Sequence, residues 1–201
     1  MKIICIGDSL TEGDYGVFGK SGIANVKEKN YPYFLQKLTN AEVVNYGKCG
    51  LNSSSYLEYF KNNAVDVSGA DYIIIMLGSN GGLDANSETQ ANIDYDELVQ
   101  LCRIGESNAQ IALCTPPHVT VNPNMSNCGY RAQVESAVSF VREYAKKNDI
   151  PLIDLANCKD FTDETEHIMQ PNDGLHFSEA GYQKIAEFVY DSLKQLFGIK
   201  K

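Results

Sequence analysis

Short apolar runs alternate with longer segments of helical period along the whole chain. Five runs have the length of a strand and are continuously apolar rather than alternating, which is typical of strands covered on both faces. They span residues 2–6, 42–46, 72–77, 110–114 and 151–155. Helices are predicted over residues 32–39, 53–61, 93–105, 130–148 and 179–197, the last with Ser178 as its N-cap. This order predicts an α/β fold, a three-layer α/β/α sandwich around a five-stranded parallel sheet.

We expect one domain over residues 1–201, because no repeat, low-complexity tract or linker-like segment divides the chain. Acidic residues outnumber basic ones by 26 to 17, the formal net charge is −9, and no run of Lys or Arg is longer than a pair. Nucleic acids and anionic membrane surfaces are bound by clustered positive charge. The sequence therefore argues against a nucleic acid or a membrane as partner.

The N-terminal sequence MKIICIGDSL has an apolar stretch too short for a signal peptide, and no later segment approaches a membrane span. A soluble, cytoplasmic protein is expected. The six cysteines show no CxxC or Cys/His ligand spacing, so they are interpreted as reduced packing residues and a structural zinc is not expected.

Polar and glycine-containing blocks stand at the strand ends where ligands bind in a parallel sheet. In chain order they are residues 7–10 (GDSL), 45–52 (NYGKCGLN), 78–82 (GSNGG) and 173–176 (DGLH). Taken singly, each has an ordinary interpretation, with Ser9 as a helix cap, Asn80 as a turn residue and His176 as a loop residue. Together they have the order of a site with a serine nucleophile, oxyanion donors, an acid and a histidine base.

The four blocks resemble those of the GDSL family of SGNH hydrolases, which are esterases and acyl hydrolases with a flavodoxin-like three-layer fold. The resemblance covers nearly the whole chain, from the first block to the fourth. It implies that Ser9 is the nucleophile, that His176 is the general base and that Asp173 orients His176. It also implies that the Ser9 N–H, Gly50 and Asn80 are oxyanion donors, that the substrate is a small-molecule ester, and that no metal or organic cofactor is required.

Three positions carry a competing assignment or a departure from the family pattern. Gly47 competes with Gly50 as oxyanion donor, and the resemblance favours Gly50, because the second block of the family usually ends its short loop on the donor glycine. Asp154 is the rival of Asp173, but it has no histidine close by in sequence. Gly81 stands where the third block of the family commonly has Asp, which questions how the loop that carries Asn80 is held.

The substrate is expected to be a short-acyl ester, such as an O-acetyl group on carbohydrate. Two long loops at the binding edge, residues 11–30 with Phe18 and residues 115–128 with His118, offer no wide apolar surface for a long acyl chain. Asp8 and His118 are predicted to bind substrate. A lysophospholipase or thioesterase-type acylhydrolase is the alternative activity.

Proteins of other functional classes share such a sheet. A phospho-acceptor module would use Asp8 and Thr115, but the third strand ends in Gly78 rather than in an acceptor Asp. A flavin-binding module would need a Ser/Thr/Gly-rich phosphate loop after the first strand, and none is present. A ligand-binding relative that has lost catalysis is the remaining alternative, because a fold does not determine a function.

Overall fold

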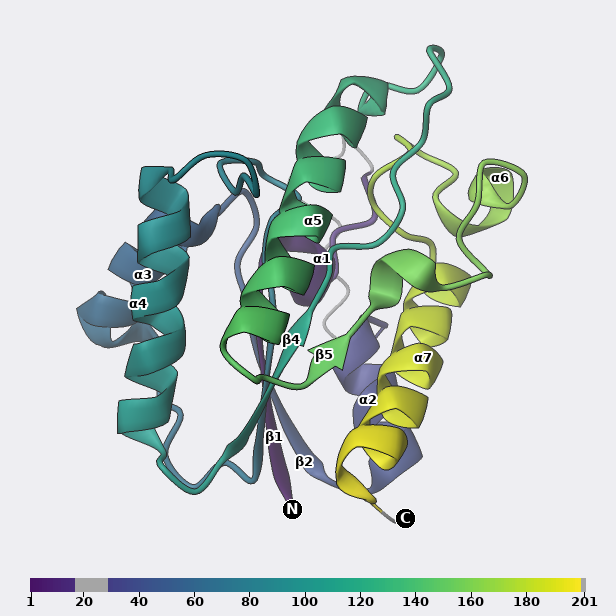
Figure 1. Ribbon diagram of the computed structural model, residues 1–201. Helices are drawn as coiled ribbons and strands as arrows, with labels where there is room; N and C mark the ends of the chain where they lie inside the picture. The colour runs from purple at the N-terminus through teal and green to yellow at the C-terminus, as the bar shows by residue number, and fades with distance from the viewer. Residues whose placement is uncertain (17–28, 200–201) are drawn as a thin grey trace.

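The computed structural model describes residues 1–16 and 29–199 (Figure 1). Phe18 and the rest of residues 17–28, in the first predicted loop, lie outside this part. Five strands form one sheet in the order β2-β1-β3-β4-β5, and every pair is parallel. They are β1 (Lys2–Gly7), β2 (Glu42–Gly47), β3 (Tyr72–Met76), β4 (Gln110–Cys114) and β5 (Leu152–Ile153). The predicted five-stranded parallel sheet is confirmed, with the strand order of flavodoxin-like folds.

Helices cover both faces of the sheet, as predicted (Figure 1). One face carries α3 (Ser53–Tyr59), α4 (Gln90–Gly105) and α5 (Arg131–Lys147), and the other carries α2 (Tyr31–Thr39) and α7 (Glu179–Phe197). Alternate residues of β1 enter the two cores, so that Ile4 packs against the first group of helices and Ile3 against the second. Both are fully buried, which explains why the strands are continuously apolar.

Several boundaries differ from the sequence prediction. Helix α4 begins at Gln90 rather than at residue 93, because the side chain of Thr89 accepts the Asn92 N–H and caps the helix. Strand β5 ends early because the chain turns into the 3-10 helix η3 (Leu155–Asn157). Four short elements were not predicted: α1 (Ser9–Glu12), the π-helical turn η1 (Phe60–Ala64), the 3-10 helix η2 (Cys128–Tyr130) and α6 (Glu166–Met169).

The cysteines form no disulfide. Burial raises the pKa of the Cys5 thiol to about 12, so this group is a packing residue and not a nucleophile. Within residues 1–16 and 29–199, no helix has both the length and the apolar character needed to cross a membrane.

Candidate active site

Ser9 lies at the point where β1 turns into the short helix α1. Strand β1 ends at Gly7, where a Cβ atom would lie 2.0 Å from Thr11 Oγ1, so only glycine allows the helix to fold back this tightly. Asp8 caps α1, because its Oδ1 accepts the Leu10 N–H at 3.0 Å. Ser9 is therefore held at the N-terminus of α1, at the carboxyl edge of the sheet, with a relative exposure of 3%.

His176 lies between Ser9 and Asp173. Its Nε2 is 2.9 Å from Ser9 Oγ, and its Nδ1 is 2.7 Å from Asp173 Oδ2. The other oxygen of Asp173 accepts the backbone N–H groups of Leu175, at 3.0 Å, and of His176, at 2.9 Å. With its proton on Nδ1, the imidazole can accept the Ser9 hydroxyl proton on Nε2 while the carboxylate holds its orientation. The structure thus brings together three residues that the sequence analysis assigned to catalysis.

The charges around His176 favour its protonated form. Burial by itself would lower the pKa of His176, but the hydrogen bond and the charge of Asp173 raise it above its ordinary value, with further contributions from Asp14 and Asp8. Burial would likewise raise the pKa of Asp173, but the hydrogen bond and charge of His176 lower it. Asp173 is therefore ionised at neutral pH and can stabilise the imidazolium that proton transfer from Ser9 would form.

The structure separates the two glycines that compete as oxyanion donors. The Gly47 N–H donates to Asn45 Oδ1 at 2.8 Å, and a Cβ atom on Gly47 would lie 2.1 Å from the Glu12 nitrogen. Gly47 is therefore a packing residue that lets α1 lie against the end of β2. Gly50 is exposed with φ +78°, and its N–H meets no acceptor among the described residues. The geometry favours Gly50.

Asn80 is held between the loops that follow β2 and β3. Its Nδ2 donates one hydrogen to the Leu51 carbonyl at 3.0 Å, which leaves the second amide hydrogen for another acceptor. Nearby, the Cys49 N–H donates to Glu12 Oε2 at 2.6 Å, which fixes the backbone just before Gly50. Both predicted donors besides Ser9 thus lie on loops tied down by side chains.

Contacts with α5 and with Asp8 hold the loop in which Gly81 replaces the usual Asp. Gln133 Nε2 donates to the Ser79 carbonyl at 2.9 Å, and the Ser79 hydroxyl donates to Asp8 Oδ2. Gly81 has φ +79°, a conformation that disfavours other residues. The loop therefore does not depend on an acidic side chain at position 81.

The structure gives no support to the prediction that Asp8 binds substrate. Asp8 is 1% exposed, its two oxygens are engaged by Leu10 and Ser79, and burial raises the pKa of its carboxyl group despite these hydrogen bonds. This position inside the turn makes Asp8 a structural link between the ends of β1 and β3.

The prediction for His118 also lacks support, because its ring contacts Asp163 and Arg131 rather than Ser9 or His176. Its Nε2 is 3.0 Å from Asp163 Oδ1, and its Nδ1 is 3.4 Å from Arg131 Nη1. It lines a cavity of about 340 Å³ against α5, to which neither Ser9 nor His176 contributes. The rival acid Asp154 binds Arg142 through Nε at 3.0 Å, and so is structural, as interpreted from its sequence context.

His118, Asp163 and Glu166 each present a ligand atom within 4.8 Å of the others, a spacing that suits a metal ion. The side chains of Thr120 and Asn122, however, donate to the two oxygens of Glu166. The Arg131 guanidinium, 3.6 Å from Asp163 Oδ1, already supplies positive charge there. These contacts describe a hydrogen-bonded network that joins the loop after β4 to α6 rather than a metal centre.

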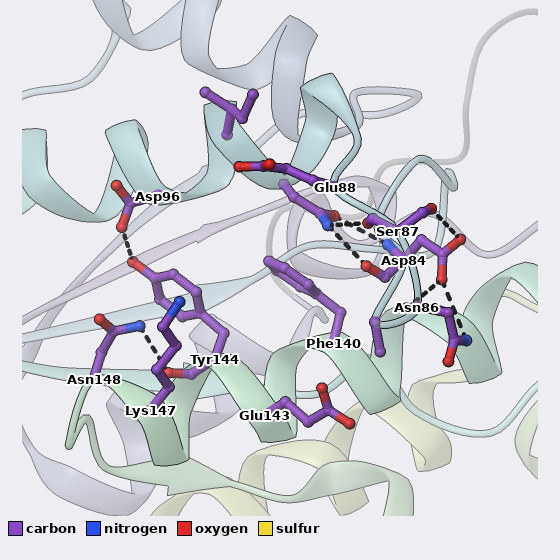
Figure 2. Close-up of a pocket in the computed structure, with 13 residues that line it drawn as sticks. Asp84, Asn86, Ser87, Glu88, Asp96, Phe140, Glu143, Tyr144, Lys147 and Asn148 are labelled. Atoms are coloured by element: carbon purple, nitrogen blue, oxygen red, sulfur yellow. Dashed lines mark hydrogen bonds between the residues drawn. The ribbon is translucent and has the colours of Figure 1, made fainter.

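A larger cavity of about 800 Å³ lies between α4 and α5 (Figure 2), and Ser9 is not among the residues that line it. Its polar walls are largely paired with one another, since the Tyr144 hydroxyl donates to Asp96 Oδ1 at 2.5 Å and Ser87 Oγ donates to Asp84 Oδ2 at 2.8 Å. Phe140 forms part of its apolar floor (Figure 2). None of the predicted catalytic or oxyanion residues lines this cavity.

Sequence reasoning missed one acidic residue at the site, Asp14. Its Oδ2 is 3.7 Å from His176 Nε2, and its side chain is 7% exposed. The only sequence signal is an acidic residue shortly after Ser9, behind Gly13, whose φ of +105° ends α1 and turns the chain back.

Comparisons with known proteins identify a family and similar folds. A family model described as the GDSL-like Lipase/Acylhydrolase family matches residues 5–184. The M. smegmatis aryl esterase is 17% identical with a TM-score of 0.75, covering 98% of this chain and 99% of that one. A carbohydrate acetylesterase from Sinorhizobium meliloti is 17% identical, with a TM-score of 0.74 and the same coverage. A lipase/acylhydrolase from Enterococcus faecalis is 20% identical, with a TM-score of 0.70, covering 100% and 98%. No match was found among curated proteins.

Proposed function

The chain belongs to the GDSL-like lipase/acylhydrolase family of ester hydrolases, and we propose that it cleaves carboxylic esters through an acyl-enzyme formed on Ser9. The observation that carries the proposal is the buried chain of contacts from Ser9 Oγ through His176 to Asp173, at 2.9 and 2.7 Å. These are the distances needed for a base to activate a hydroxyl nucleophile.

In the proposed first step, His176 Nε2 takes the hydroxyl proton as Ser9 Oγ attacks the ester carbonyl. The N–H groups of Ser9 and Gly50 and the free amide hydrogen of Asn80 bind the oxyanion, and each such donor contributes about 10²–10³ to turnover. His176 then returns the proton to the departing alcohol oxygen. In the second step, water attacks the acyl group by the same route and releases the acid.

We further propose a short acyl group, such as acetyl, on a carbohydrate or another polar alcohol. The described loops after α1, β2 and β3 carry small or polar side chains at this edge of the sheet: Asp14 lies beside His176 and Cys49, and Asn80 contacts the Leu51 carbonyl. The name of one structural neighbour, a carbohydrate acetylesterase, is in keeping with such a substrate, although at 17% identity the likeness itself shows only the fold.

The test compares the rates on nitrophenyl acetate, butyrate and octanoate for the wild-type protein and for Ser9→Ala. We expect acetate to be the fastest and Ser9→Ala to lose about 10³-fold or more in rate. Ser139→Ala, an exposed serine on α5, is the matched control and should keep its rate. Faster turnover of octanoate would favour a long-chain acylhydrolase, and a wild-type rate in Ser9→Ala would refute the nucleophile assignment.

A further inference from the structure

The acid Asp14 is fixed beside the nitrogen that carries the proton during acyl transfer. His176 Nε2 faces Ser9 Oγ at 2.9 Å and Asp14 Oδ2 at 3.7 Å. Asp14 is held there by its own backbone, because its N–H donates to the Ser9 carbonyl at 3.0 Å and its carbonyl accepts the Tyr182 hydroxyl. These backbone contacts fix the position of Asp14 relative to Ser9 and His176.

One oxygen of the Asp14 carboxylate lacks a strong hydrogen-bond donor. Oδ1 accepts the Gly16 N–H at 2.8 Å. Among the described residues, Oδ2 meets only the weakly donating Cys49 thiol, at 3.7 Å, and His176 at the same distance. The Asp14 side chain is only 7% exposed, and a carboxylate oxygen in a side chain this buried normally accepts a strong hydrogen bond, because leaving it unpaired costs free energy. Oδ2 can therefore accept a hydrogen bond from a donor on a bound molecule.

That donor would belong to the alcohol part of an ester. When the tetrahedral intermediate collapses, the bond between the carbonyl carbon and the alcohol oxygen breaks, and the Nε2 proton of His176 moves to that oxygen while the acyl group stays on Ser9. The alcohol oxygen must approach Nε2 to receive the proton. Because Asp14 Oδ2 lies 3.7 Å from Nε2, a hydroxyl on the neighbouring carbon would be placed to donate to it.

We propose that Asp14 binds the leaving alcohol and selects esters with a free hydroxyl group on the carbon next to the ester-bearing carbon, as in partly acylated sugars and polyols. This inference rests on the proposed acyl transfer at Ser9. A hydroxyl is the donor that fits, since Oδ2 offers one directional acceptor in a confined place, whereas a quaternary ammonium has no hydrogen to donate. Anionic alcohols are repelled by Asp14 and by Glu12.

The experiment compares two acetates that differ in one hydrogen-bond donor, 2-hydroxyethyl acetate and 2-methoxyethyl acetate. For the wild-type protein we expect kcat/KM to be about tenfold or more higher for the hydroxyethyl ester, as for a hydrogen bond to a charged acceptor. In Asp14→Asn the carbonyl oxygen keeps the Gly16 N–H and the NH₂ group faces the alcohol. The ratio should then fall to about one. The control is Glu12→Gln, which removes the charge of a neighbouring acid. Glu12 accepts the Cys49 N–H and does not contact His176 in the described structure, so this variant should keep the ratio of the two rates.

The outcomes separate this inference from the proposed function. A wild-type ratio near one, with Ser9-dependent hydrolysis of nitrophenyl acetate intact, overturns the role of Asp14 and leaves the nucleophile assignment standing. This comparison needs no variant, so it does not depend on the folding of Asp14→Asn. Equal loss of the ratio in Glu12→Gln, or faster turnover of acetylcholine than of the hydroxyethyl ester, would show a general effect of charge and overturn direct binding. Absence of any Ser9-dependent esterase activity overturns both proposals.

Discussion

Replacing Asp173 by Asn removes one charge and reverses one hydrogen bond at the centre of the site. The Asn oxygen can keep the backbone N–H groups of Leu175 and His176, which Asp173 Oδ1 accepts at 3.0 and 2.9 Å. The NH₂ group then faces His176 Nδ1 where the carboxylate oxygen stood at 2.7 Å. Two donors cannot share that contact, so the imidazole proton moves to Nε2, the atom that must accept the Ser9 proton.

The expected loss of kcat in Asp173→Asn has two causes. A hydrogen bond to a charged group contributes about 1.5–3 kcal/mol, or about 10- to 150-fold in rate. The wrong tautomer adds to this, and in a serine protease triad the same substitution costs about 10⁴. We therefore predict that kcat of Asp173→Asn on nitrophenyl acetate falls by about 10³–10⁴. The thermal unfolding midpoint should change little, because the backbone contacts of Oδ1 are kept.

The matched comparison is Asp173→Ala, which leaves the buried N–H groups of Leu175 and His176 without their hydrogen-bond acceptor. It should lower the free energy of unfolding by about 1–3 kcal/mol, seen as a lower midpoint in thermal unfolding. An Asp173→Asn variant that is folded and retains a rate within tenfold of wild type would refute the assignment of Asp173 as the orienting acid.

Three further predictions concern the donors, the packing and the proton of the site. Asn80→Ala should lower kcat by about 10²–10³ with little change in KM; an unchanged kcat in steady-state assays would remove Asn80 from the oxyanion site. Gly16→Ala, whose Cβ would lie 2.4 Å from Asp173 Oδ2 at a φ of +68°, should reduce both stability and kcat. The control Gly69→Ala, at φ +69° in open space, should show only the strain of about 1–3 kcal/mol. Activity requires neutral His176, so the acidic limb of kcat/KM should have its midpoint above 6.5, the ordinary pKa of histidine. A midpoint below 6.5 would contradict the raised pKa.

The sequence was sufficient to predict the sheet and the residues around Ser9 for one physical reason. The carboxyl ends of parallel strands meet at one edge, so polar residues that follow different strands come together whatever the loops between them do. Strand positions therefore placed Ser9 after β1 and Asn80 after β3 at one edge, and the resemblance to the GDSL family supplied their roles. His176 came from its place in the block before α7.

The directions of single side chains were not predictable in this way. Asp8, Glu12 and Asp14 are all acidic and lie within seven residues, yet Asp8 is internal, Glu12 binds the Cys49 N–H and Asp14 faces His176. Which acid takes which place depends on the four-residue helix α1 and on the left-handed turn at Gly13. Elements this short have no periodicity from which a face can be inferred.

The first residue of helix α4 was also not predictable from the apolar pattern. Thr89 caps α4 through one side-chain contact with the Asn92 N–H, which adds no apolar residue to the pattern. The early end of β5 depends instead on a tertiary contact, in which the Ala156 N–H donates to Thr115 Oγ1 at 2.9 Å. This second feature becomes visible only when distant segments are placed together.

Labelling with a fluorophosphonate probe, followed by mapping of the adduct by mass spectrometry, tests the proposed nucleophile most directly. The reagent reacts with a serine hydroxyl that a neighbouring base has activated, and the contact of Ser9 Oγ with His176 Nε2 at 2.9 Å predicts a single adduct on Ser9. That adduct should disappear in Ser9→Ala and persist in Ser139→Ala. An adduct on another residue, or labelling that is unchanged in Ser9→Ala, would contradict an acyl-enzyme on Ser9.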